Sequence, residues 1–170
     1  LSDWDLKQHQ KGELQTYGYL FDISQLFEVY IEKLISHRLP NWSVVAQQQL
    51  LSYQDSFYKR HMYPDIVLRY QPKEGNDEYL NENLEDKIIV LDTKFKTMRF
   101  ESRDLDRADF YQIHTYMQYY GKNLLLGGLI YPLSKPHDTN ESHSSSLFGR
   151  GDDSPMFIVD GIELVDFEED

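Results

Sequence analysis

The sequence has no cysteine among its 170 residues and no long run of apolar residues. The absence of cysteine excludes disulfide frameworks, cysteine zinc sites, iron–sulfur clusters and thiol catalysis. No apolar run approaches the roughly 18–20 residues that span a bilayer, so we expect no membrane partner. Residues 1–5 hold neither the basic nor the apolar region of a secretory signal. A cytoplasmic protein is therefore expected, and the missing initiator methionine predicts a fragment or a processed chain.

Positive charge is also scarce, because 17 Lys and Arg residues face 29 Asp and Glu residues, for a formal net charge of −12. Two segments carry all of this excess. Residues 72–87 hold six acids and two bases, and residues 152–170 hold eight acids and no base. The remaining chain is neutral. This balance argues against strong autonomous DNA binding, which normally shows a basic footprint, but it does not exclude nucleic acid as a partner.

The length and the ordinary globular composition predict a single domain over residues 1–170. Asp22, followed by Gln25, is typical of a helix N-cap. Apolar spacing predicts a mixed α/β (α+β) fold with helices over 22–39 and 104–120 and strands within 42–53, 62–70, 87–96 and 124–131. Residues 134–154 are predicted to form a flexible loop. Asp160-Gly161 predicts the turn of a C-terminal hairpin over residues 155–167.

Acidic and basic side chains lie on two of the predicted central strands. Asp92 and Lys94 are two residues apart, so on a strand both side chains point to the same face. A second carboxylate, Asp65, stands after Pro64 on the preceding strand. Two carboxylates and a backbone carbonyl can hold Mg²⁺, which prefers oxygen ligands. A neighbouring lysine can orient a water molecule or stabilise phosphoryl charge.

These residues resemble the signature of the PD-(D/E)xK nuclease superfamily. Pro64-Asp65 is similar to its first half and Asp92-Thr93-Lys94 to its second half. Glu28 lies on the preceding helix, where members often carry an acid that completes the metal site. Gln112 and Tyr116 fit the Q-x-x-x-Y pattern of the RecB-like branch and are four residues apart, hence on one helix face. The resemblance implies a mixed central sheet flanked by helices, with the element order αβββαβ.

Four segments are similar to the nuclease portion of McrC subunits from McrBC-type modification-dependent restriction systems: 26–28, 64–68, 92–96 and 109–116. The similarity covers about residues 20–132, which are the expected nuclease core. It implies a Mg²⁺-dependent DNA endonuclease, in which Mn²⁺ can substitute. It also implies two partners, DNA and a GTP-driven AAA+ motor subunit of McrB type.

The resemblance assigns the metal site to three carboxylates and one carbonyl. Glu28, Asp65 and Asp92 would bind the metal ion, helped by the backbone carbonyl of Thr93. Lys94 would position or activate the attacking water. The chemistry expected of this set is hydrolysis of a phosphodiester bond.

Three further residues are expected to contact the substrate. Gln112 and Tyr116 would position the DNA backbone or the water near the metal. Lys96 points to the same face as Lys94 but lies farther along the strand, and we interpret it as a phosphate contact.

Two other interpretations stay open at this point. The chain could be a different nuclease of the same fold, such as a RecB-like exonuclease or another restriction enzyme. It could also be a catalytically silent assembly module, with Glu28 a solvated residue, Gln112 a satisfied polar residue and Tyr116 part of the core. Metal binding would separate the silent module from a nuclease, and dependence on a GTPase partner would separate the two kinds of nuclease.

Overall fold

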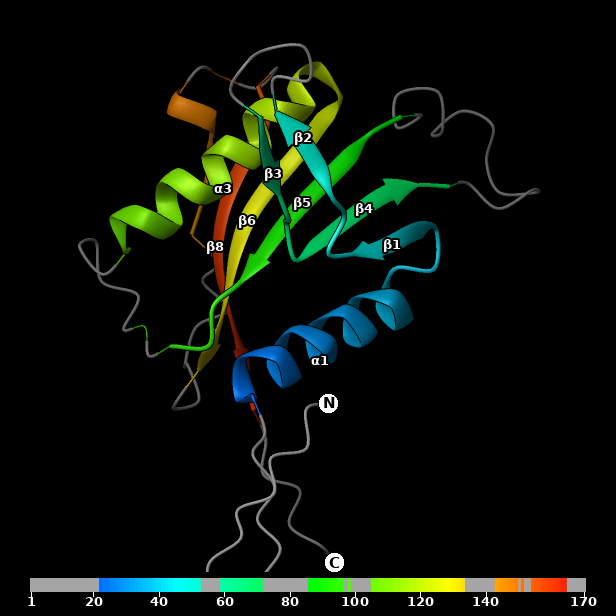
Figure 1. Cartoon of the computed structure of the whole chain (residues 1–170), viewed down its shortest axis with the longest axis vertical. Helices are drawn as coiled ribbons and strands as arrows, with labels where there is room; N and C mark the ends of the chain where they lie inside the picture. Colours follow the sequence, from blue (N-terminus) through cyan, green and yellow to red (C-terminus); the bar gives the residue numbers. More distant parts are fainter. Residues whose placement is uncertain are drawn as a thin grey trace, which may run out of the picture.

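The computed structural model describes residues 22–52, 59–71, 86–96, 98, 105–133, 143–149, 151 and 154–164. In this part of the chain two helices flank a mixed sheet (Figure 1). The predicted mixed α and β architecture is therefore confirmed. The acidic segment 72–87 lies almost wholly outside the described residues, and so do residues 165–170 of the acidic tail.

Both predicted helices are present. The first, α1, spans Ile23–Arg38, and the side chain of Asp22 accepts hydrogen bonds from the backbone N–H groups of Ser24 and Gln25, which confirms the expected N-cap. The second, α3, spans Arg107–Tyr120 and is capped by Asp106, so it begins later than the expected Asp104. No helix in the described ranges is long and apolar enough to cross a membrane.

The strands form a six-stranded sheet and a separate two-stranded ribbon. Their bounds are β1 Trp42–Ala46, β2 Leu50–Ser52, β3 Arg60–Met62, β4 Ile66–Tyr70, β5 Ile88–Thr93, β6 Leu124–Leu133, β7 His143–Ser146 and β8 Met156–Glu163. Within the described ranges the sheet order is β1-β4-β5-β6-β8-β7, and β2 pairs with β3. β1, β4 and β5 are antiparallel, β5, β6 and β8 are parallel, and β7 is antiparallel to β8. Short 3₁₀ turns span Gly121–Asn123 and Leu147–Gly149.

Alternate residues of the central strands build a separate core on each face of the sheet. Val67 of β4 and Val90 of β5 pack with Ile113 and Met117 of α3. Their neighbours Ile66, Leu68 and Leu91 pack with Phe27 and Ile31 of α1. Because side chains alternate across a strand, α1 and α3 cover opposite faces of the sheet. The ends of β4 and β5 are thereby fixed from both sides.

The predicted C-terminal hairpin is wrong. Residues Met156–Glu163 form one continuous strand, β8, which runs straight through Asp160-Gly161. β8 pairs in parallel with β6 from Met156 to Glu163 and with β7 on its other edge. At Asp160 and Gly161 the parallel pairing with Ile130 and Tyr131 of β6 outweighs the local preference of an Asp-Gly pair for a turn, since the pairing with β7 ends at Val159. Residues 165–167 of the predicted hairpin lie outside the described residues.

Two smaller predictions also need correction. The flexible loop expected over 134–154 contains the strand β7 and the 3₁₀ turn that follows it, while residues 134–142, 150 and 152–153 are outside the described ranges. The single strand expected within 42–53 is divided at Gln47–Gln49 into β1 and β2. At this division Gln47 has a positive φ of 47°, which side-chain-bearing residues rarely adopt.

Gly127 of β6 provides a test of the core on the α3 face. A Cβ atom at this position would lie 2.3 Å from the Cγ atom of the buried Met117. We expect Gly127→Ala to lower the free energy of unfolding by about 1–3 kcal/mol through overpacking, measured by urea denaturation. In a Met117→Ala background the same substitution should cost less. An equal cost in both backgrounds would show that this contact is not the cause.

Candidate active site

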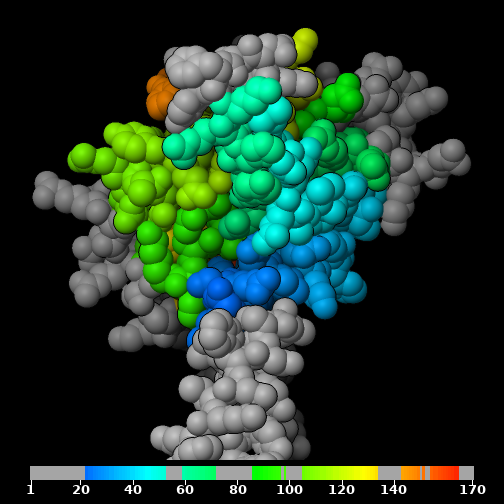
Figure 2. All heavy atoms as spheres, in the orientation of Figure 1, coloured from blue at the N-terminus to red at the C-terminus, as the bar shows by residue number. Residues whose placement is uncertain are grey.

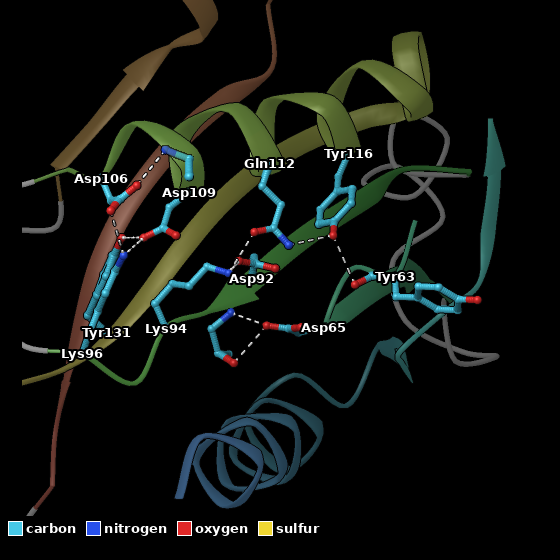
Figure 3. Close-up of polar contacts among 12 residues, drawn as sticks. Tyr63, Asp65, Asp92, Lys94, Lys96, Asp106, Asp109, Gln112, Tyr116 and Tyr131 are labelled. Atoms are coloured by element: carbon cyan, nitrogen blue, oxygen red, sulfur yellow. Dashed lines mark hydrogen bonds and ion pairs between the residues drawn. The ribbon is translucent and has the colours of Figure 1, made fainter. Parts of the chain in front are cut away.

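The structure brings the two predicted aspartates together at one end of the sheet. The antiparallel register pairs Ile66 of β4 with Leu91 of β5. The next position along both strands places Asp65 beside Asp92, on the face that carries Val67 and therefore faces α3. Figure 3 shows the two carboxylates close together, below Gln112 and Tyr116 of α3.

Asp65 is held in place by the last residue of β5. Its Oδ2 atom accepts hydrogen bonds from the backbone N–H of Thr93 at 2.7 Å and from the Thr93 hydroxyl at 3.1 Å. The Asp65 side chain is half-buried. Both bonds are accepted by Oδ2. Because the carboxylate group is rigid, they also fix the orientation of Oδ1.

Asp92 is the unusual residue of the site, because its side chain is fully buried. Apart from the ammonium of Lys94, no hydrogen-bond donor in the described residues reaches either carboxylate oxygen. The one favourable contact is an ion pair, in which Oδ2 lies 2.5 Å from the Lys94 ammonium nitrogen. Burial, and then the negative charge of Asp65, raise the pKa of the Asp92 carboxyl to about 7, although Lys94 acts in the opposite direction.

Lys94 is a cation that its surroundings keep protonated. Burial disfavours its charge, but the contact with Asp92 and the negative charges of Asp109 and Asp65 outweigh this penalty, so the pKa of Lys94 is raised. Its backbone N–H continues the parallel ladder by donating to the Ile130 carbonyl at 2.9 Å. The backbone and the ammonium of Lys94 are thus both fixed.

A chain of hydrogen bonds connects Lys94 with the helix α3 (Figure 3). The Lys94 ammonium donates to Gln112 Oε1 at 3.0 Å, and Gln112 Nε2 donates to the Tyr116 hydroxyl at 2.9 Å. The Tyr116 hydroxyl donates to the backbone carbonyl of Tyr63 at 3.3 Å. Tyr63 is two residues before Asp65, so this chain of hydrogen bonds ends beside the start of β4. Gln112 and Tyr116 are therefore brought to the site as predicted.

Glu28 reaches the site from the opposite helix, α1, and contacts neither aspartate directly. Its Oε1 atom accepts a hydrogen bond of 3.0 Å from the side-chain amide of Gln47. Burial, and then the negative charge of Asp65, raise the pKa of Glu28. Among the described residues, no three His, Asp or Glu side chains are arranged as a ready metal cage. Asp65 and Asp92 therefore form the fixed part of the site.

A second polar cluster adjoins the site and contains the remaining predicted residue, Lys96. Its ammonium forms a close ion pair with the buried Asp109 of α3 and lies 3.6 Å from Asp106. The hydroxyl of Tyr131, on β6, donates to Asp109 Oδ2 at 3.2 Å. The cluster ties the end of β5 to the start of α3 and to β6 (Figure 3). Lys96 as a phosphate contact stays a prediction.

Sequence reasoning missed Asp109, Tyr131 and Gln47. The sequence contains a signal that could have identified Asp109. This residue stands one helical turn before Gln112 and therefore lies on the same face of α3. The sequence contains no such signal for Gln47, because the contacts of this residue depend on a turn between β1 and β2 that the sequence does not indicate. Figure 2 shows that α1, α3 and the β2–β3 ribbon all reach the same face of the molecule, around the end of β5.

The burial of Asp92 makes the stability of the metal-free protein depend on pH. Its folded-state pKa of about 7 lies above its ordinary value of 3.8, so the folded state keeps a proton that the unfolded chain has lost. The free energy of unfolding in EDTA should then fall as the pH rises from about 4 through about 7. Asp92→Asn should remove this fall and be more stable than the wild type by about 2–4 kcal/mol at pH 8.

Chemical denaturation at several pH values tests this expectation. Asp160→Asn, which changes a half-buried acid of β8, is the matched control and should keep the wild-type slope. Parallel curves for the wild type and Asp92→Asn would contradict the assignment of a raised pKa to Asp92.

The fold is similar to one found in a solved complex. That structure is described as a refined half-complex from the tetradecameric assembly of Thermococcus gammatolerans McrB AAA+ hexamers with bound McrC. The similarity has a TM-score of 0.53 and 20% sequence identity, and it covers 88% of this chain. The present chain spans only 30% of the length of that protein. At this identity the likeness shows a shared fold.

A comparison with curated protein sequences finds no match. A family model does match residues 5–132, which are most of the chain, and it is described as a McrBC 5-methylcytosine restriction system component. The matched range contains both aspartates, Lys94, Gln112 and Tyr116. The chain therefore belongs to the McrBC restriction system component family, as the resemblance of its motifs to McrC-type subunits predicted.

Proposed function

We propose that this chain is the DNA-cleaving core of a McrBC-type restriction complex, and that it hydrolyses phosphodiester bonds with Mg²⁺ as its cofactor. It would act as an endonuclease of the PD-(D/E)xK type. The observation that carries this proposal is the fully buried Asp92 carboxylate, whose only hydrogen-bond donor within the described residues is the ammonium of Lys94. Such a group costs stability in the metal-free protein and is typical of a functional site.

The residues present fit a hard divalent cation. Asp65 and Asp92 supply carboxylate oxygens from adjacent strands, and Lys94 alone supplies less charge than the two aspartates carry. Oxygen donors of this kind suit Mg²⁺ or Mn²⁺. Asp65, Asp92 and the Thr93 carbonyl would hold the ion, with Glu28 as the third carboxylate. When bound, the ion supplies Lewis-acid stabilisation of the phosphate charge and a more acidic water.

Lys94 acts as a positioned cation rather than as a base. Because its pKa is raised, its ammonium keeps its proton at neutral pH and can donate to the attacking water or to a phosphate oxygen. Removing the proton from Lys94 would be costly beside three carboxylates. Its contribution is therefore orientation of the nucleophile and stabilisation of the charge that develops on the phosphate.

Gln112 and Tyr116 hold Lys94 in that position. The Gln112 carbonyl oxygen accepts from the ammonium, and its amide donates to Tyr116. Gln112 is exposed while the Tyr116 ring is buried, so Gln112 can contact the DNA backbone without breaking the core. The two side chains would thus orient both the lysine and the substrate.

A partner that delivers DNA fits the charge of this chain. The net charge is −12, and a polyanion gains affinity mainly from contacts with Lys and Arg. The solved structure with a similar fold is of McrC bound to McrB AAA+ hexamers. We extend this arrangement to the present chain as its expected partner, a GTP-driven AAA+ motor of McrB type that selects the site and brings DNA to the nuclease.

A silent assembly module of the same fold is the second candidate, favoured by the absence of a ready metal cage in the described residues. A nuclease of the same fold that works without a GTPase, RecB-like or another restriction type, is the third. Cleavage of methylated and unmethylated plasmid with and without the cognate motor separates the three. The silent module cuts in neither case, and the third candidate cuts equally well in both.

Substitution of the two central residues separates metal binding from rate. We expect Asp92→Ala to abolish cleavage, while Lys94→Ala keeps Mn²⁺ affinity near that of the wild type and loses about 10²–10³-fold in rate, because it removes a charge-stabilising donor. Calorimetry with Mn²⁺ and plasmid cleavage with the motor and GTP provide the two measurements. Asp160→Asn and Lys122→Ala are the matched controls. A wild-type rate for Asp92→Ala would disprove the proposal.

The isolated chain should bind DNA weakly. At physiological salt its acidic segments repel DNA within a Debye length of roughly 8–10 Å, and the 17 Lys and Arg residues are outnumbered by 29 Asp and Glu residues. We expect salt-sensitive binding of duplex DNA, with a modest gain in affinity after deletion of residues 152–170. Fluorescence anisotropy across a salt series measures both effects. Nanomolar binding by the isolated chain at physiological salt would contradict this expectation.

A further inference from the structure

Gln47 stands at a strained point between α1, β1 and β4. Its φ of 47° lies in the left-handed region that favours glycine and asparagine. Position 47 is neither glycine nor asparagine, so the residue type does not favour this conformation. Strained backbone of this kind persists where surrounding contacts determine it, and it concentrates at functional sites.

Two hydrogen bonds determine the position of Gln47. The register pairs Ala46 with Ile66, so Gln47 stands opposite Asp65, and its backbone N–H donates to the Asp65 carbonyl at 2.9 Å. Its side-chain amide donates to Glu28 Oε1 at 3.0 Å. One residue therefore joins the backbone of a β4 aspartate to the carboxylate of an α1 glutamate.

The strained backbone of Gln47 and its side-chain hydrogen bond to Glu28 are connected. The left-handed turn is what directs the side chain of an exposed residue back toward α1 rather than into solvent. Glu28 and Asp65 repel each other, since the charge of Asp65 is among the causes that raise the pKa of Glu28. A donor to Glu28 stabilises the carboxylate in a place where repulsion alone would drive its side chain away.

We propose that Gln47 is a positioning residue that holds the Glu28 carboxylate toward the Asp65–Asp92 pair and thereby completes the divalent-metal site. The inference rests on the metal site under the proposed function and adds a residue to it. Gln47 contacts no reacting atom. It acts through Glu28 by fixing the one metal ligand that comes from a helix on the other face of the sheet.

The variant Gln47→Gly separates the effect of the backbone conformation from the effect of the side-chain amide. Gln47→Gly adopts a positive φ without strain and keeps the backbone N–H to Asp65, but it loses the amide. The folded protein should therefore be at least as resistant to heat as the wild type. Gln47→Asn also tolerates this conformation, but its shorter side chain cannot reach Glu28. We expect both variants to bind Mn²⁺ about five- to tenfold more weakly, measured by titration calorimetry without DNA.

A double-mutant cycle distinguishes positioning from a general structural effect. In a Glu28→Gln background there is no carboxylate to position, so Gln47→Gly should change the Mn²⁺ affinity less than twofold. Ala46→Gly, which adds a glycine at the neighbouring exposed position without removing an amide, is the matched control and should bind Mn²⁺ like the wild type.

The outcomes separate this inference from the metal site itself. Wild-type Mn²⁺ affinity in Gln47→Gly, or an equal loss in the presence and absence of the Glu28 carboxylate, overturns the role of Gln47 while leaving the site in place. Unchanged Mn²⁺ binding by Asp92→Asn overturns the metal site, and the inference with it. A loss of affinity confined to the background that retains Glu28 supports the role of Gln47.

Discussion

The site depends on one constraint, which is the burial of a carboxylate at the end of a central strand with a single cation beside it. Asp92 is there because β5 lies between β4 and β6, and the ladder pairs on both sides fix its backbone. The Lys94 ammonium nitrogen lies 2.5 Å from Asp92 Oδ2, and the described residues supply no other hydrogen-bond donor to this carboxylate. Desolvation and the nearby Asp65 both disfavour the charge. The fold therefore maintains an electrostatically costly group, and the surrounding packing must supply the stability that this group removes.

The polar contacts around this carboxylate are divided between two directions. Toward α3, Lys94, Gln112 and Tyr116 form a directional chain in which each group donates to the next. Beside it, Lys96 and Tyr131 hold Asp109 at the start of the same helix. The two sets fix α3 against the end of β5 through Asp109 in its first turn and Gln112 in its second turn, and Tyr116 one turn later contacts the carbonyl of Tyr63. The orientation of the Lys94 ammonium thus follows from how the helix packs, and it does not rely on the flexible lysine chain itself.

Much of this could be predicted from the sequence, since the central strands and both helices have strong periodicity and Asp22 has a clear capping pattern. Strand alternation predicted that Asp92 and Lys94 share a face, and Asp65 was added by the motif that these residues resemble. The failures have a common physical reason. Asp160-Gly161 is a good local turn, but its parallel pairing with β6 overrides that preference. The contacts of Asp109 with Tyr131, and of Gln47 with Glu28, join residues distant in sequence, which no local pattern encodes.

The carboxylates also differ in how firmly the fold holds them. Asp65 and Asp92 stand on paired strands, and Asp65 is fixed further by Thr93. Glu28 stands on α1, across the sheet, and one amide from a strained turn orients its longer side chain. Three rigid carboxylates in close contact would add repulsion to a site that already buries one charge. Under the proposed function, the longer side chain of Glu28 lets the protein tolerate the site without metal, and a bound cation would draw all three carboxylates together. The hydrogen bond from the strained Gln47 then orients this side chain in the absence of a cation.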